Sequence, residues 1–170
     1  MIEAAIFVIF PFCMAFAAVS DMLSMTIANR VPVLLVAAFA VLAPLTGMAW
    51  PEFGMHFAAM AAVLTVTFVL FAVGGMGGGD AKLLAATALW MGFDMNLLYY
   101  LTVSAMFGGL LTLLIVFYRS SLFADITINN VILRNFADRS AGIPYAIALG
   151  LGGLAAYVHS PLMIWALARF

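Results

Sequence analysis

Five apolar stretches, each about as long as a membrane is thick, limit this chain to a helical fold. They lie at residues 2–20, 31–50, 53–75, 97–118 and 143–167. A spanning helix needs about 20 mostly apolar residues, and it satisfies its own backbone hydrogen bonds in lipid. With 68% hydrophobic and 8% charged residues, the chain has too little polar surface to form a soluble domain. We therefore predict an all-α, polytopic membrane protein.

A sixth apolar segment, at residues 81–92, is shorter than the others. Twelve residues of helix reach only about 18 Å, against about 30 Å of hydrocarbon. We predict that it forms an abbreviated fourth span, which gives about six transmembrane helices; a re-entrant segment is the alternative. Little sequence remains for a soluble part, so we predict a single transmembrane domain over residues 1–170, with no separate soluble or methyltransferase domain.

The basic residues predict an orientation in the membrane. If the short segment is counted as the fourth of six spans, five basic residues lie in or beside the loops after spans one, three and five. They are Arg30, Lys82, Arg119, Arg134 and Arg139. Cytoplasmic loops carry an excess of Lys and Arg, so we expect these loops in the cytoplasm and both termini outside. We also expect the mixed polar and apolar segment 125–134 to lie along the membrane surface. A net charge of -1 offers no basic face for nucleic acid.

Two aspartates lie where a membrane protein carries charge least easily. Asp21 ends the first apolar stretch, and Asp80 follows a segment in which five of the six residues 74–79 are glycine. Ionisable groups at membrane depth are costly, so by default they indicate a functional, paired site. Two expected spans separate these residues, which brings both carboxylates to the same membrane face. The glycines permit close backbone approach, and a short helix that starts below the surface would place Asp80 in a water-accessible recess.

Two carboxylates around one water molecule can hydrolyse a peptide bond. Like charges in a poorly hydrated site share one proton, so the ionised carboxylate can accept a proton from water while the protonated one polarises the scissile carbonyl. This chemistry needs no metal and no cofactor. The simpler alternatives are a flexible or close-packing glycine loop and an interfacial, helix-capping Asp21. His56 and His159 share no ligand spacing, so we predict no metal site.

Three segments resemble one known family, the type IV prepilin peptidases. Residues 77–84 (Gly-Gly-Gly-Asp-Ala-Lys-Leu-Leu) resemble its Gly-x-Gly-Asp-x-Lys-Leu signature. Asp21 followed by Ile-Ala-Asn at 27–29 is similar to the first-aspartate motif, with Ala28 where the family commonly has proline. Ile-Pro-Tyr at 143–145 resembles the third characteristic segment. The compact chain is similar to the short, CpaA/TadV-like branch, which serves tight-adherence (Flp-type) pili.

The resemblance implies an aspartic endopeptidase of the bacterial inner membrane, with its active site at the cytoplasmic face. Such enzymes cut the cytoplasmic leader of a prepilin or pseudopilin after a glycine, just before a hydrophobic helix. Carried over by position, Asp21 and Asp80 would be the catalytic pair. The residues that would shape or support the site are Gly77, Gly79, Lys82 and Asn29. The implied partners are the prepilin or pseudopilin substrate and the lipid bilayer.

Two other functions remain open from the residues alone. A small transporter or proton-relay protein could use the same two carboxylates, although no inverted repeat relates the two halves of the chain. A non-catalytic component of a pilus or secretion assembly is the other alternative. The sequence also leaves open which prepilin is cleaved, the preferred leader, the oligomeric state and whether the two aspartates meet without substrate.

Overall fold

A computed structural model of the chain describes residues 1–130 and 133–169. Residues 131–132, in the segment expected at the membrane surface, and Phe170 of the expected domain lie outside the described residues. The described part is 78% helix without strands, which confirms the all-α prediction. Its helices are α1 Ile2–Ser24, α2 Arg30–Leu45, α3 Trp50–Ala72, α4 Gly78–Met91, α5 Met95–Arg119, α6 Leu122–Thr127, α7 Arg134–Ala137, α8 Ala146–Tyr157 and α9 Pro161–Leu167.

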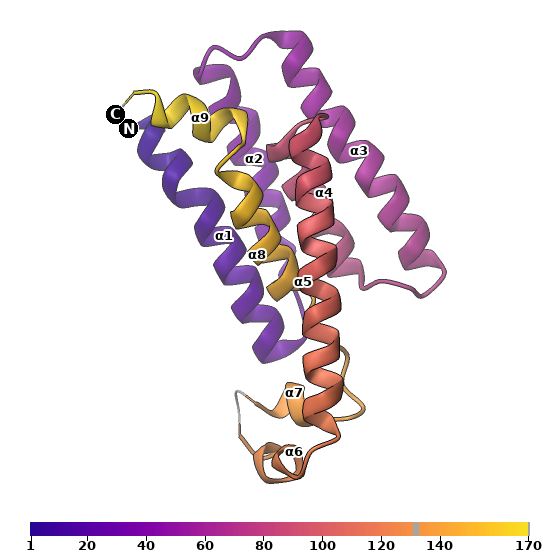
Figure 1. Ribbon diagram of the computed structural model, residues 1–170. Helices are drawn as coiled ribbons and strands as arrows, with labels where there is room; N and C mark the ends of the chain where they lie inside the picture. Colours follow the sequence, from indigo (N-terminus) through magenta and orange to yellow (C-terminus); the bar gives the residue numbers. More distant parts are fainter. Residues whose placement is uncertain (131–132, 170) are drawn as a thin grey trace.

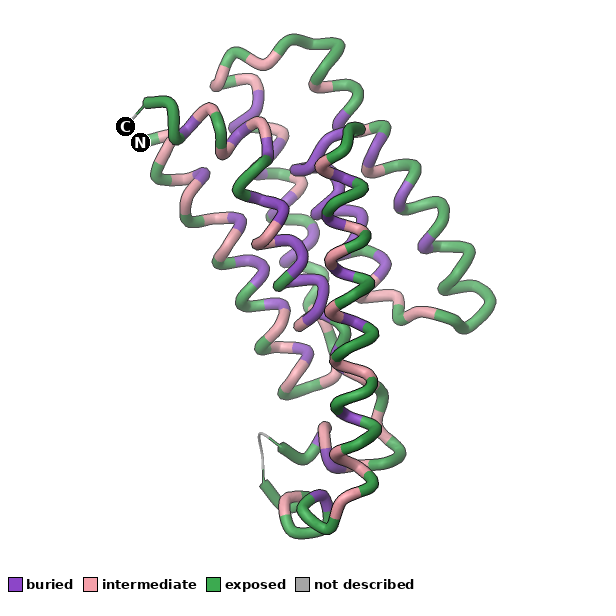
Figure 2. Tube along the Cα trace, viewed as in Figure 1, coloured by how far each residue is buried: buried purple, intermediate pink, exposed green. Residues whose placement is uncertain are grey.

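The short helix α4 lies at the centre of the bundle (Figures 1 and 2). It packs against α3, α2, α8 and α5, and its residues from Leu83 to Met91 are all buried. Small side chains let helices approach closely in a membrane, and α4 contains four alanines and two glycines. This composition favours its central position, and its 14 residues place its first turn, which contains Asp80, inside the bundle.

An aromatic cluster fixes α4 relative to its neighbours. The Trp90 ring of α4 lies 5.2 Å from that of Phe10 on α1, which in turn stacks at 4.1 Å on Tyr157 of α8. The polar atoms of this cluster have backbone partners: Trp90 Nε1 donates to Leu35 O at 3.1 Å, and Tyr157 Oη to Ile6 O at 2.7 Å. Such bonds matter in lipid, where no water replaces a missing partner. Together they join α1, α2, α4 and α8.

Helix α3 contacts α2 near its start and then diverges from α2 while it packs along α4 (Figure 1). Near its start, Phe53 and Phe57 lie 6.0 and 6.2 Å from Phe39 of α2. In its second half, only Val63 and Thr67 are buried, and the other side chains of that half are exposed (Figure 2). The α3–α4 loop, with Gly74 at a φ of +77°, then returns the chain to the centre.

Three described helices, α1, α3 and α5, are long and apolar enough to cross a membrane. The helices α8 and α9, which meet at a bend of 50°, give a fourth span if they are counted as one. Helices α2, with 16 residues, and α4, with 14, are shorter than the helices counted as spans. Helix α2 ends earlier than the expected residue 50 because Gly47, at a φ of +84°, turns the chain towards α3. The expectation of about six spans therefore stays a prediction.

Two further helices differ from their expected bounds. The last span, expected to be continuous over 143–167, begins at Ala146 and is interrupted before α9. Pro161, the first residue of α9, has no N–H that could continue the hydrogen bonding of α8. The Ser160 hydroxyl caps the new helix by accepting the N–H of Met163 at 3.3 Å. Helix α4 begins at Gly78 rather than at 81, so Gly78 and Gly79 are helical. Burial of α4 outweighs their low helix propensity.

The two short helices α6 and α7 lie beyond the main bundle, at the end of the long helix α5 (Figure 1). Both chain termini lie together at the opposite end of the molecule (Figure 1). The loop between Arg119 and Ala146, called here the α5–α8 loop, therefore covers the end of the bundle where α1 ends and α4 begins.

Candidate active site

Asp21 lies in the last turn of α1 and is held by the start of α8. Its side chain is 6% exposed, and its Oδ2 accepts the backbone N–H of Ala146 at 3.0 Å. Ala146 is the first residue of α8, whose unpaired N–H groups and helix dipole favour a negative charge. Asp21 is thus anchored by backbone from the other end of the chain.

Asp80 lies in the first turn of α4, half-buried. Its Oδ1 is buried and has no hydrogen-bond partner among the described residues. A buried carboxylate oxygen without a partner is costly unless water or a ligand reaches it. This oxygen therefore has unused capacity to accept a hydrogen bond from a water molecule.

The structure brings the two predicted carboxylates together. Asp21 and Asp80 both line a cavity of about 710 Å³, and both also line an adjoining cavity of about 250 Å³. The larger cavity is lined further by Met25, Gly74, Gly75, Met76, Gly77, Arg119, Ala141, Gly142, Ile143, Tyr145 and Leu149. Two carboxylates that line one cavity can act together on the same water molecule and the same substrate carbonyl.

A side chain at position 77 or 79 would crowd the surroundings of the aspartate pair. A Cβ at Gly77 would lie 2.8 Å from Asp80 Oδ2, closer than a real Cβ comes to its neighbours. A Cβ at Gly79 would lie 3.2 Å from Ile27 Cβ, in the loop after α1. Gly77 thus makes room for the Asp80 carboxylate, and Gly79 allows the loop after α1 to approach α4.

Lys82 and Asn29 contact each other. Lys82 Nζ donates to Asn29 Oδ1 at 3.0 Å, which joins the first turn of α4 to the start of α2. Both side chains are exposed. Asn29 lines the smaller cavity with the two aspartates, whereas Lys82 lines neither of the two cavities that hold the pair. Lys82 is therefore connected to the smaller cavity by its hydrogen bond to Asn29.

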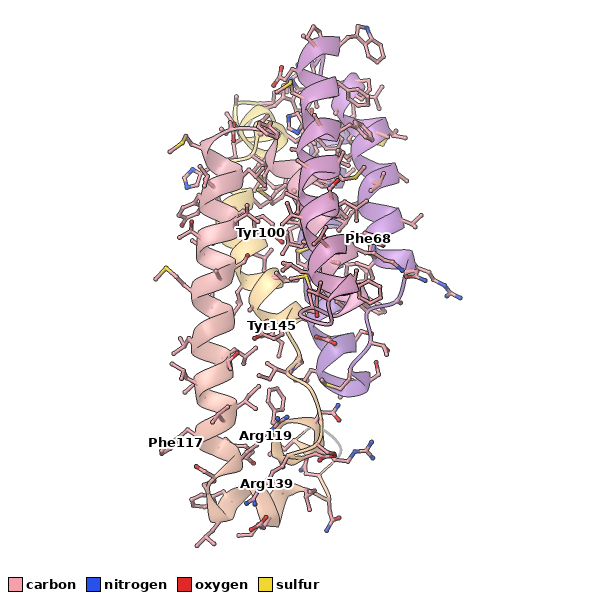
Figure 3. All side chains as sticks on the ribbon, turned by 90° about the vertical axis from the view of Figure 1, so that its right-hand side faces the viewer. Phe68, Tyr100, Phe117, Arg119, Arg139 and Tyr145 are labelled. Carbon is pink, nitrogen blue, oxygen red and sulfur yellow. The ribbon has the colours of Figure 1, made fainter. Side chains whose placement is uncertain are left out.

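Arg119 is a cavity residue that the sequence pattern did not single out. Its guanidinium donates to three carbonyls of the α5–α8 loop, those of Asn135, Phe136 and Gly142, at 3.0, 3.1 and 2.8 Å. Figure 3 shows Arg119 below Tyr145, which begins the approach to α8. The sequence indicates only that Arg119 helps to set the orientation in the membrane. Nothing in the neighbouring residues indicates the carbonyls that it contacts.

Asn135, in the same loop, contacts the helix that carries Asp21. Its buried side chain donates to the carbonyls of Met22 at 2.8 Å and Leu23 at 3.1 Å. These carbonyls belong to the last turn of α1, where the helix itself offers no donors. No sequence signal identifies this contact, since its partners are more than a hundred residues away.

The two histidines contact different groups. His56 is buried, with Nδ1 2.7 Å from Leu89 O, and the His159 ring lies 6.0 Å from that of Tyr99. Over residues 1–130 and 133–169, no three His, Cys, Asp or Glu side chains gather as metal ligands would.

The fold and the site define a helical membrane protein in which two distant aspartates line one cavity. Comparison with family models finds a match over residues 8–124 to the type IV leader peptidase family. The match covers more than half of the chain, so this protein belongs to that family and is a peptidase. It includes both aspartates, whereas residues 143–145 lie beyond it. Comparisons with curated proteins and with solved structures find no match.

Proposed function

We propose that this protein removes the leader peptide from prepilins or pseudopilins of the tight-adherence (Flp) type, cutting after a glycine. Family membership supports a leader peptidase. The observation that carries the proposed chemistry is the shared cavity of Asp21 and Asp80, which come from helices far apart in the sequence. The Flp-type substrate follows from the resemblance of the sequence to the short branch of the family.

In the proposed reaction, the two carboxylates activate a water molecule and the scissile carbonyl together. The ionised aspartate accepts a proton from water as the oxygen attacks the carbonyl carbon, and the protonated aspartate donates to the carbonyl oxygen. The tetrahedral intermediate then collapses: the C–N bond breaks, the aspartate that took the water proton gives it to the leaving amine, and the other aspartate recovers its proton from a hydroxyl of the intermediate. The leader keeps the new carboxylate, and the mature pilin keeps the new N-terminus. No covalent enzyme intermediate forms.

Each supporting residue has a proposed part in this reaction. The helix α8 N-terminus orients Asp21 through the Ala146 N–H, and the unpartnered Asp80 Oδ1 is the atom that the water would meet. Gly77 leaves space for the Asp80 carboxylate. The Lys82–Asn29 hydrogen bond holds the start of α4 against the start of α2. These roles follow from contacts rather than from position in a motif.

We further propose a site at the cytoplasmic face of a bacterial inner membrane. The basic residues of the α5–α8 loop and Lys82 lie towards the end of the bundle that holds the aspartates, and the positive-inside rule places that end in the cytoplasm. Both termini, at the opposite end in Figure 1, would then lie outside. Cysteine labelling of residues introduced at the two ends tests this orientation.

The test is cleavage of a candidate prepilin by the purified protein, with the product's N-terminus read by mass spectrometry. We expect a single cut after a glycine before the hydrophobic helix. Asp21→Asn and Asp80→Asn should each lower the rate by at least about 10³-fold, because neither amide can take part in the proton transfers. Abundance and membrane insertion should not change.

Asp94→Asn serves as the matched control, because Asp94 caps α5 through the Asn96 N–H and lines neither cavity of the pair. Its cleavage rate should equal that of the wild type. Normal processing by either the Asp21 or the Asp80 variant would contradict the proposed mechanism.

A further inference from the structure

A groove of about 530 Å³ lies between α2, α3 and α4. Ten of its twelve lining residues are apolar, and the two polar ones are the hydrogen-bonded Lys82 and Asn29. The divergence of α3 from α2 opens this groove. Phe39, Phe53 and Phe57 pack across it near the start of α3, whereas the second half of α3 lies away from α2 (Figure 1).

The groove adjoins the cavities of the aspartate pair. Asn29 lines the groove and also the 250 Å³ cavity that contains Asp21 and Asp80. The groove therefore leads from an almost wholly apolar surface to the aspartate pair. A chain lying in it would reach the two carboxylates by passing Asn29.

The lining of the groove suits a helix. Its inner wall includes the small side chains of Ala37, Ala40, Ala85 and Ala86, which allow another helix backbone to approach closely in a membrane. A helix that enters with its N-terminus at Asn29 would bring unpaired N–H groups there, and the Asn29 side chain offers an acceptor. The Lys82 ammonium can donate to a carbonyl of the chain preceding that helix.

We infer that this groove receives the hydrophobic helix of the substrate, with its first turn at Asn29 and its leader continuing into the 710 Å³ cavity. The inference rests on the proposed function, in which the cleaved bond lies just before such a helix. The scissile bond would then lie between the apolar groove and the cavity lined by Arg119, beside Asp21 and Asp80. The groove is continuous with the cavity of the aspartate pair through Asn29. This favours a substrate helix as its occupant, because a lipid chain would not need access to the two carboxylates.

The first test fills the groove. Ala37 is exposed on α2 and lines the groove, so Ala37→Phe should obstruct a docking helix. We expect the KM for the full precursor to rise at least about tenfold, while a short peptide with the leader and the scissile bond but no helix is cleaved within about twofold of the wild-type rate. A precursor KM equal to that of the wild type, or an equal loss on both substrates, would overturn the inference.

Ala62→Phe is the matched control for this substitution. Ala62 is exposed on α3 and does not line the groove, and at about 100° per residue it faces away from Phe57, Met60 and Leu64. The same added volume on this lipid-facing side should leave both substrates within about twofold of the wild type.

The second test captures the occupant directly. A photoreactive benzoylphenylalanine at position 37, in the inactive Asp80→Asn protein, should cross-link to the hydrophobic helix of the precursor, and the same group at position 62 should not. Adducts with lipid alone at position 37 would overturn the inference. If the wild type cleaved neither substrate, the proposed function would fail separately, and the cross-link would still decide whether the groove holds this helix.

Discussion

At the scale of single residues, the two aspartates are positioned by different means. Asp21 is held from outside its own helix by the Ala146 N–H, whereas Asp80 depends on the first turn of α4 and on the space that Gly77 leaves. One carboxylate is therefore anchored, and the other keeps an oxygen without a partner in the described structure. This asymmetry suits a pair whose two members take part in different proton transfers.

Gly77→Ala tests the space beside Asp80. The added Cβ would lie 2.8 Å from Asp80 Oδ2, so the carboxylate must move. Misplacement of a reacting group by about 1 Å can cost about 10²-fold in rate, and we expect a loss of that order in kcat on a prepilin substrate. The measurement is kcat at equal amounts of inserted protein.

Gly109→Ala provides the comparison for that variant, because a Cβ there meets nothing within 4 Å on α5. Its activity should match that of the wild type. Full activity of Gly77→Ala would show that the carboxylate does not need its present position.

At the scale of secondary-structure elements, the α5–α8 loop connects three parts of the site. Arg119 holds the loop through three carbonyls, Asn135 holds the end of α1, and the loop then leads to the start of α8, where Ala146 contacts Asp21. The loop therefore spans the cavity from α5 to both elements that position Asp21.

Asn135→Ala should loosen the last turn of α1. It removes two hydrogen bonds to the carbonyls of Met22 and Leu23, a change worth about 1–3 kcal/mol when buried partners are left unsatisfied. We expect kcat on the short leader peptide to fall several-fold with little change in KM, because Asp21 is in the affected turn. Steady-state kinetics of the purified variant measure both constants.

Two comparisons separate this positioning role from a general loss of stability. Asn135→Gln keeps the amide and should restore part of the lost kcat. Asn129→Ala, at an exposed position in the same loop, should behave as the wild type. A change in KM alone would contradict the positioning role.

At the scale of the whole molecule, close helix contacts at glycines hold the site elements together. A Cβ at Gly152 of α8 would overlap Ser104 Oγ on α5 and would lie 2.9 Å from Ser104 Cα. A Cβ at Gly150 would lie 3.3 Å from Met14 O on α1. Helix α8 thus approaches α1 and α5 so closely that only glycine fits at the closest of these contacts, as small residues allow in membrane bundles.

Gly152→Ala should therefore destabilise the bundle by about 1–3 kcal/mol, the usual cost of overpacking. Thermal unfolding in detergent micelles measures the effect as a lower Tm. Gly54→Ala on α3, where a Cβ meets nothing within 4 Å, should not lower the Tm, because alanine has the higher helix propensity. Equal Tm values for the two variants would contradict this account of the α5–α8 contact.

Much of the architecture could be predicted because it depends on local composition. The apolar stretches indicated where most helices lie, and the short segment before residue 92 became the central helix α4. The break between α8 and α9 was missed, although Pro161 marks it, because an apolar run through Ser160 favoured one continuous span. The start of α4 was placed too late, because glycines 78 and 79 have low helix propensity and only burial makes them helical.

The sequence by itself determined the helical membrane fold, the family and the two aspartates as candidate catalytic residues. Only the tertiary structure decided that these aspartates line one cavity, that Ala146 binds Asp21, that Arg119 and Asn135 hold the loop beside them, and that an apolar groove leads to the pair. The physical reason is that the partition of a helix into lipid depends only on the residues of that one stretch. The shape of a cavity depends on how helices that are distant in the sequence pack against one another.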